Sequence, residues 1–185
     1  MYPPPHKNKN DLLKRLESLF NPETLHHFLK IHLILQRGET PTLTYQERDD
    51  IFQVGCSFMN WHDFTPAARI FRFLINDNPE EPRNYYAYSF CALQQDHPEE
   101  AFSAAYHCYQ ENPDSARGFS LLIEALIKLD EPNTVALAID HFNAHFKDHP
   151  FLTNHYEPIR APLGTPTGSL QDQLESIHQA RCPHD

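Results

Sequence analysis

The chain has 185 residues, of which 40% are hydrophobic and only 5 are glycine, and this composition favours one mainly helical domain. Its formal net charge of -10 argues against nucleic-acid binding, which requires a basic face. No window approaches the roughly 18 consecutive apolar residues of a membrane span, so none is expected. Because the first residues also lack the apolar core of a secretory signal, we expect a cytoplasmic protein.

The N-terminal part of the sequence divides into two segments. Residues 1–10 are polar and rich in proline, and we expect them to be disordered. In residues 11–47, apolar residues at helical spacing predict helices that are interrupted at Asn21, which is expected to cap the second piece. Thr44 and Glu47 have the spacing of a capping box, which predicts that a helix begins there.

The middle of the chain, residues 48–150, repeats at a fixed interval. The step from Ala67 to Ala101 is the same as the step from Pro79 to Pro113, and we call it the repeat period. Its length matches the period of about 34 residues that is typical of the tetratricopeptide repeat. In that repeat two helices form a hairpin, and successive hairpins stack.

Three repeats are predicted, and they begin at Arg48, Pro82 and Ala116. The second helix of the third repeat matches the pattern only if about three residues are inserted around residues 130–133, which places Ala138 where the other two repeats have alanine. We therefore predict an all-α fold. It consists of three tandem tetratricopeptide-like helical hairpins in a short right-handed superhelix, flanked by N-terminal helices and a C-terminal helix.

The C-terminal part begins with residues 151–169, which contain several prolines and glycines and are expected to be a linker. Residues 170–185 are predicted to form a last short helix and a tail, with Ser169 and Asp172 at the helix start. The apolar side of this helix carries Leu170, Leu174 and Ile177.

Thirteen histidines suggest a search for a metal site. The best cluster is His141, His145 and His149, which are four residues apart, and two such residues on a helix can bind zinc. Because no HExxH motif or cysteine partner accompanies them, we interpret them as the polar outer face of a helix and predict no metal and no cofactor. The sequence lacks a GxSxG motif, a Walker loop and a Cys-His signature, so we predict that the protein is not an enzyme. A metal-binding or hydrolytic protein that uses these histidines stays open as an alternative.

The first repeat carries further motifs. Residues 50–55 contain an aromatic-Gln-x-Gly pattern, residues 64–74 contain Ala-x-x-x-Phe-x-x-Leu, and Asn78-Pro79 follows. With these motifs the chain resembles the class II tetratricopeptide-repeat chaperones of bacterial type III secretion translocators, over about residues 24–142. The second repeat departs from the family pattern, which has glycine where this chain has serine.

The resemblance implies a bacterial cytosolic chaperone with a role in virulence. Such a chaperone holds an extended apolar segment of a pore-forming translocator in a concave groove and keeps this secreted partner soluble and competent for export. The resemblance also implies a homodimer. We expect no nucleic-acid partner, because the net charge is acidic, and no insertion into the membrane. A general tetratricopeptide interaction scaffold, or a co-chaperone of needle subunits, is the alternative.

The resemblance also assigns residues to these roles. The groove is expected to be lined by the second, fifth, ninth and twelfth residues of the first helix of each repeat: Asp49, Phe52, Cys56, Met59, Arg83, Tyr86, Phe90, Leu93, Arg117, Ser120, Glu124 and Ile127. Dimerisation is assigned to apolar residues of the N-terminal segment: Leu12, Leu16, Leu19, Phe20, Leu25, Phe28 and Leu29. The alternative for Phe52 and Tyr86 is burial under a neighbouring helix, for instance the C-terminal one.

Overall fold

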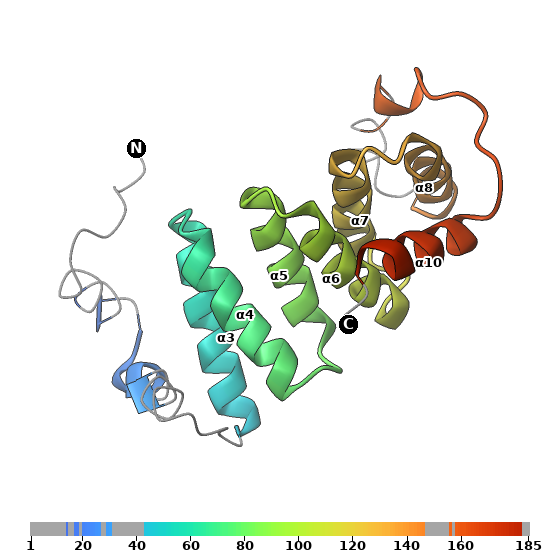
Figure 1. Ribbon diagram of the computed structural model, residues 1–185. Helices are drawn as coiled ribbons and strands as arrows, with labels where there is room; N and C mark the ends of the chain where they lie inside the picture. The colour runs from blue at the N-terminus through green and yellow to red at the C-terminus, as the bar shows by residue number, and fades with distance from the viewer. Residues whose placement is uncertain are drawn as a thin grey trace. The chain divides into compact units, whose positions relative to one another are not determined.

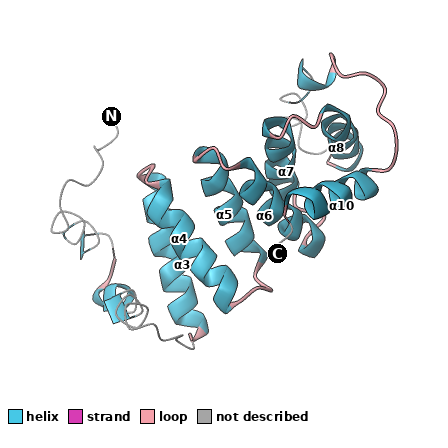
Figure 2. Ribbon diagram, in the orientation of Figure 1, coloured by secondary structure: helices cyan, strands magenta, loops and turns pink. Residues whose placement is uncertain are grey.

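The structure of the protein is a computed structural model, drawn in Figure 1. It describes residues 14, 17–18, 20–26, 29–30, 43–146, 156 and 158–182. In these ranges the protein is helical and without strands, as Figure 2 shows. None of the helices in the same ranges combines the length and apolar character that a membrane span requires. The chain divides into two compact units, Met1–Pro79 and Glu80–Asp185.

Six of the described helices form three hairpins, and this confirms the predicted all-α repeat architecture. The first helices of the hairpins are α3 (Tyr45–Asn60), α5 (Pro82–Gln94) and α7 (Ala116–Lys128). The second helices are α4 (Phe64–Asp77), α6 (Pro98–Glu111) and α8 (Pro132–His145). A separate helix, α10 (Leu170–Arg181), lies near the C-terminus.

The second helices of the hairpins keep the repeat period without interruption. Helices α4, α6 and α8 begin at positions 64, 98 and 132 and end at positions 77, 111 and 145. The insertion predicted around residues 130–133 is therefore wrong. Val135, and not Ala138, occupies the place that Ala101 has in α6. Val135 is buried there, which shows that the position accepts a branched apolar residue as well as alanine.

The turn inside each hairpin is closed by a residue in the left-handed region. His62, Asp96 and Asp130 have φ angles of 58°, 60° and 59° and follow one another at the repeat period. After the first of them, the N–H of Asp63 donates to the carbonyl of Phe58 at 3.0 Å. The equivalent bonds join His97 to Ala92 and Glu131 to Leu126. This bond satisfies a carbonyl at the end of each first helix, as in a Schellman motif, so the chain reverses in the same way three times.

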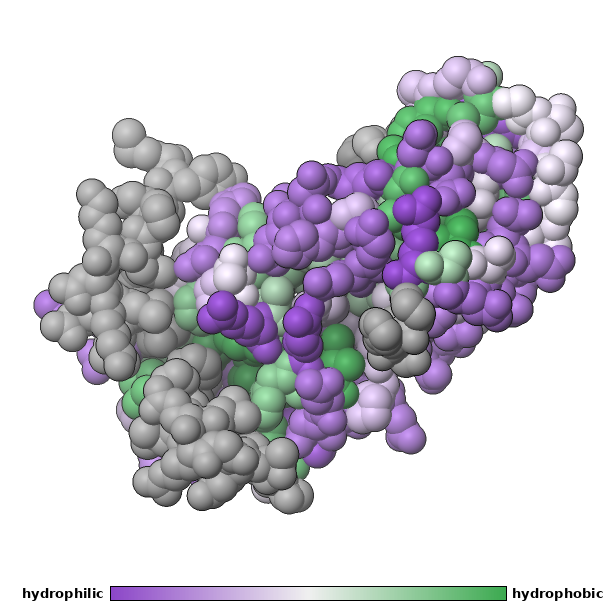
Figure 3. Space-filling view, in the orientation of Figure 1, coloured by the Kyte–Doolittle hydropathy of each residue, from purple (hydrophilic) through white to green (hydrophobic). Residues whose placement is uncertain are grey.

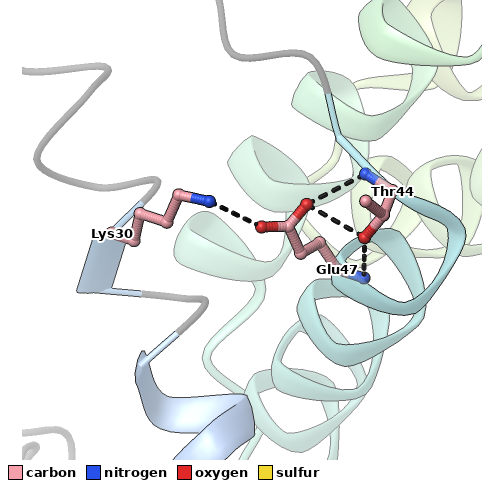
Figure 4. A network of polar contacts seen from close by, with 3 residues as sticks. All are labelled: Lys30, Thr44 and Glu47. Carbon is pink, nitrogen blue, oxygen red and sulfur yellow. Dashed lines mark hydrogen bonds and ion pairs between the residues drawn. The ribbon is translucent and has the colours of Figure 1, made fainter.

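Helix α3 begins with the predicted capping box, drawn in Figure 4. The Thr44 hydroxyl accepts the N–H of Glu47 at 3.3 Å, and the Glu47 carboxylate accepts the N–H of Thr44 at 2.9 Å. Lys30 Nζ donates to the other carboxylate oxygen at 2.8 Å. The hydrogen bond from Lys30 and that from the Thr44 backbone lower the pKa of Glu47 to about 2. The buried carboxylate of Glu47 thus both caps the start of α3 and binds Lys30 of the N-terminal segment.

Helices α3 and α4 approach closely at Gly55. A Cβ atom at this position would lie 2.7 Å from two carbons of the Phe71 ring, which is fully buried. In the second hairpin, Ser89 stands in the place of Gly55 and Ala105 in the place of Phe71. The Ser89 hydroxyl donates to the carbonyl of Ala101 at 2.9 Å. The departure from glycine is therefore accommodated because a methyl group replaces the opposing ring.

The second unit has an apolar core to which α5, α6, α7, α8 and α10 contribute. The hydroxyl of Ser169 accepts a backbone N–H three residues on at 3.4 Å, which confirms the predicted start of α10. Leu174 and Ile177 of α10 are buried in this core. The ring of His178 lies 5.0 Å from that of Tyr106 on α6. Helix α10 therefore packs on the second helices of the hairpins, α6 and α8 (Figure 1).

Candidate interaction surface

The predicted groove residues of the first unit lie on α3. Asp49, Phe52, Cys56 and Met59 are all half-buried. The ring of Phe52 lies 5.3 Å from the ring of Phe71, so Phe52 packs against α4 and keeps only part of its surface exposed. The last three of these side chains follow one another at helical spacing and form an apolar row on α3.

In the second unit, α5 carries the next set. Arg83, Tyr86 and Phe90 are half-buried, and the two aromatic residues pack against the core with part of their surface exposed. Leu93 is only 4% exposed and belongs to the core itself. The prediction that Leu93 lines the groove is therefore wrong, because its side chain is enclosed by the packed hairpins.

Helix α7 lies beside α5 and carries the last set. Arg117, Glu124 and Ile127 are exposed, and Ser120 is half-buried. We call the exposed and half-buried members on these two helices the α5–α7 surface: Arg83, Tyr86, Phe90, Arg117, Ser120, Glu124 and Ile127. In Figure 3 most of the visible described surface is hydrophilic, and hydrophobic side chains form patches between the hydrophilic ones.

The charges on this surface come mainly from equivalent positions of the two helices. Arg83 and Arg117 are both the second residue of their helix. The Nε atom of Arg83 lies 3.7 Å from the carboxylate of Glu81, while the side chain of Arg117 is exposed. Guanidinium groups beside aromatic rings can pair with the carboxylates or carbonyls of a partner while the rings bury its apolar side chains.

The far end of α7 is joined to the turn after α5. Lys128 Nζ lies 2.6 Å from the carboxylate of Asp96, the left-handed residue of that turn. The hydrogen bond from Lys128 lowers the pKa of Asp96. The pair is exposed, so its contribution to stability is small.

Tyr156 adjoins this surface and was not predicted from the sequence. It falls in the range expected to be a linker, yet its backbone is helical and its side chain is 1% exposed. Its hydroxyl donates to the carbonyl of Ser120 at 3.2 Å, and its ring meets that of Phe142 edge-on at 5.6 Å. Burial raises the pKa of Tyr156, and the charge of Glu124 raises it further. The repeat period could have predicted the burial of Tyr156, because Tyr156 stands one period after the buried Leu122.

The residues assigned to dimerisation are described only in part. Phe20 and Leu25 are half-buried, and Leu29 is 36% exposed. The other four lie outside the described residues: Leu12, Leu16, Leu19 and Phe28. The assignment remains a prediction.

The histidine cluster is also described in part, since His149 lies outside the described residues. The ring of His141 stacks on that of His145 at 3.9 Å and lies 5.1 Å from the ring of Phe119. Burial lowers the pKa of His141, and the neighbouring His145 lowers it further. In the part of the chain that the structure describes, no group of three His, Cys, Asp or Glu side chains is placed to hold a metal.

The chain resembles a known protein in its fold but not in its sequence. No protein-family model and no curated protein matches the sequence. Among solved structures, the chain is similar to the TPR2AB domain of yeast Sti1 in complex with pHSP90, with a TM-score of 0.55 and 15% sequence identity. The likeness covers 90% of this chain and 60% of that chain, so this chain spans less than two thirds of its neighbour. It confirms the tetratricopeptide-like fold and does not select the secretion chaperones among proteins with that fold.

Proposed function

We propose that the protein binds a segment of another polypeptide and that the α5–α7 surface is a main contact. The observation that carries this proposal is the partial exposure of Tyr86 and Phe90 on α5, with Arg83 on the same helix and Arg117 on the neighbouring α7. Partly exposed aromatic residues beside arginines are the groups that most often dominate binding energy at protein interfaces. The similar structure from yeast Sti1 is a complex with pHSP90, which supports a polypeptide as the kind of partner.

The partner segment is proposed to be extended and apolar. An extended chain presents successive side chains to opposite sides, so alternate residues can pack on the exposed parts of Tyr86 and Phe90. Exposed carboxylates or carbonyls of the segment would pair with Arg117. The apolar row on α3, formed by Phe52, Cys56 and Met59, is proposed as a further contact in the first unit.

In its more specific form, the proposal is a cytoplasmic chaperone of a bacterial type III secretion system. The motifs in residues 50–55 and 64–74 support this form, because they resemble those of translocator chaperones and lie on the α3–α4 hairpin. A translocator carries membrane-seeking segments, and masking one of them keeps the protein soluble until export. This role requires neither a cofactor nor a chemical step.

A general interaction scaffold, or a co-chaperone of needle subunits, is the second candidate, because the likeness to known structures concerns the fold alone. The two candidates differ in the partner's conformation. A needle subunit would present an amphipathic helix, whereas a translocator would present an extended segment. Synthetic peptides of each kind, titrated against the purified full chain, distinguish them by which one binds.

The decisive experiment is co-expression of the full chain with candidate membrane-active secreted proteins, followed by copurification. The variant Tyr86→Ala/Phe90→Ala should keep its helical circular dichroism spectrum and retain less than about a tenth of the partner, since truncated hot-spot residues each cost roughly 1–2 kcal/mol or more. Tyr45→Ala is the matched control, because Tyr45 is an aromatic residue of α3 that is 72% exposed and lies outside the surface. If the double variant copurifies the partner in wild-type amounts, the surface is wrongly assigned.

A further inference from the structure

A built site for one aromatic ring lies between α7 and α8, and Tyr156 occupies it. The ring is 1% exposed and meets the fully buried ring of Phe142. The same Phe142 ring lies 4.9 Å from Phe146 and 6.2 Å from Phe119. At the edge of this apolar environment, the Tyr156 hydroxyl donates to the carbonyl of Ser120 at 3.2 Å. The site therefore suits a phenol, with a flat apolar body and one donor at its tip.

The repeat period explains why this position is filled. Tyr88 on α5, Leu122 on α7 and Tyr156 follow one another at that period. All three are buried, with exposed fractions of 8%, 0% and 1%. Tyr156 thus stands where the first helix of a further hairpin would cover the preceding one, and residues 158–160 beside it are helical.

Tyr156 also borders the α5–α7 surface. Ser120, whose carbonyl accepts its hydroxyl bond, is a member of that surface. Glu124, one turn further along α7, is close enough for its charge to act on the Tyr156 hydroxyl. The aromatic site therefore lies directly beside the α7 side of the surface.

We propose that the side chain of Tyr156 fills an aromatic-binding site and that the α5–α7 surface ends at α7 because this site is already filled. The contact with a partner segment then ends at α7, and the partner inserts no aromatic residue into the site that Tyr156 fills. The second statement rests on the function proposed above, whereas the aromatic site itself does not.

The aromatic site is tested without any partner. Tyr156→Ala should lower the melting temperature of the full chain by roughly 10 °C, as other large-to-small core changes do. Adding 4-methylphenol, the tyrosine side chain as a free molecule, should raise the melting temperature of this variant, because an apolar cavity of fitting shape binds a ring. Wild type and Tyr45→Ala both keep the Tyr156 ring and have no such cavity, so 4-methylphenol should not raise their melting temperatures comparably. A variant that responds no more than these controls overturns the site.

Two further variants keep this test decisive. Tyr156→Phe keeps the ring and loses only the hydroxyl, so its melting temperature should stay close to that of wild type and should not respond to 4-methylphenol. If Tyr156→Ala does not fold alone, recovery of a cooperative unfolding transition with 4-methylphenol supports the site. The absence of recovery, also in Tyr156→Val, counts against it.

The closure of the surface is tested by selecting binders from a random dodecapeptide library displayed on phage. Wild type should enrich apolar segments without an aromatic residue at one fixed end, and Tyr156→Ala should enrich the same segments extended by an aromatic residue there. An unchanged motif in the variant overturns the closure alone. If neither protein enriches a motif, the proposed function fails, while the 4-methylphenol result still decides the aromatic site.

Discussion

Gly55 shows how a single atom limits the approach of two helices. A Cβ at Gly55 would lie 2.7 Å from the ring of Phe71, which is fully buried, so a methyl group there would force the ring or the helices to shift. We expect Gly55→Ala to lower the free energy of unfolding by about 1–3 kcal/mol, as overpacking does. Urea unfolding followed by circular dichroism measures this change.

Gly164 provides the matched control for that substitution. A Cβ at Gly164 would meet nothing within 4 Å, so Gly164→Ala should change the free energy of unfolding by less than about 0.5 kcal/mol. The second hairpin suggests a compensated variant, Gly55→Ser/Phe71→Ala, which copies Ser89 and Ala105. Its destabilisation should be smaller than the sum of the two single changes. Strict additivity would show that the close approach is not what makes glycine necessary.

Among the helices, α3 depends most clearly on one side chain at its start. The pKa of Glu47 in the folded protein, about 2, lies below its ordinary value of 4.5. The stabilisation by this carboxylate is therefore complete above about pH 4.5 and is lost as the pH falls through about 2. Glu47→Gln should cost about 1 kcal/mol at neutral pH, as the loss of a cap does.

The pH dependence of unfolding checks this prediction. Between pH 7 and pH 3, wild type should lose more stability than Glu47→Gln, because only wild type has this carboxylate to protonate. Lys30→Met is the control that keeps the capping box, and it should have a smaller effect at neutral pH because the Lys30 side chain is 50% exposed. The same pH profile for wild type and Glu47→Gln would contradict the assignment.

At the scale of the whole molecule, we predict its assembly from the N-terminal segment. We predict a homodimer formed through the N-terminal segment, in which Leu25 is half-buried and Leu29 is 36% exposed. Leu25→Asp/Leu29→Asp should convert the dimer to a monomer, because a charge buried in an apolar interface without a partner is costly. Light scattering coupled to size-exclusion chromatography measures the mass, and circular dichroism checks that helix content is kept. A wild-type monomer at micromolar concentration would refute the prediction.

The features that the sequence predicted correctly are formed by local interactions within one hairpin or one helical turn. The period linking Ala67 with Ala101 marks a repeated hairpin, because each hairpin needs small residues and turns at the same places. The capping box of Thr44 and Glu47 spans three residues, and its bonds form within one helical turn. Such features are readable because the atoms that interact are close together along the chain.

Other features depend on what a distant segment places against a residue. Val135 replaces alanine in the third hairpin because the core accepts its volume. The search for alanine at this position therefore gave the wrong register, whereas the helix boundaries keep the repeat period. Leu93 has the spacing of a groove residue but is enclosed by the packed hairpins. Tyr156 lies in a proline-rich range, yet it is buried because α7 and α8 supply an apolar site and a carbonyl 36 residues earlier in the chain. Spacing predicts the helix face on which a side chain lies, whereas its burial depends on long-range packing that a local pattern does not contain.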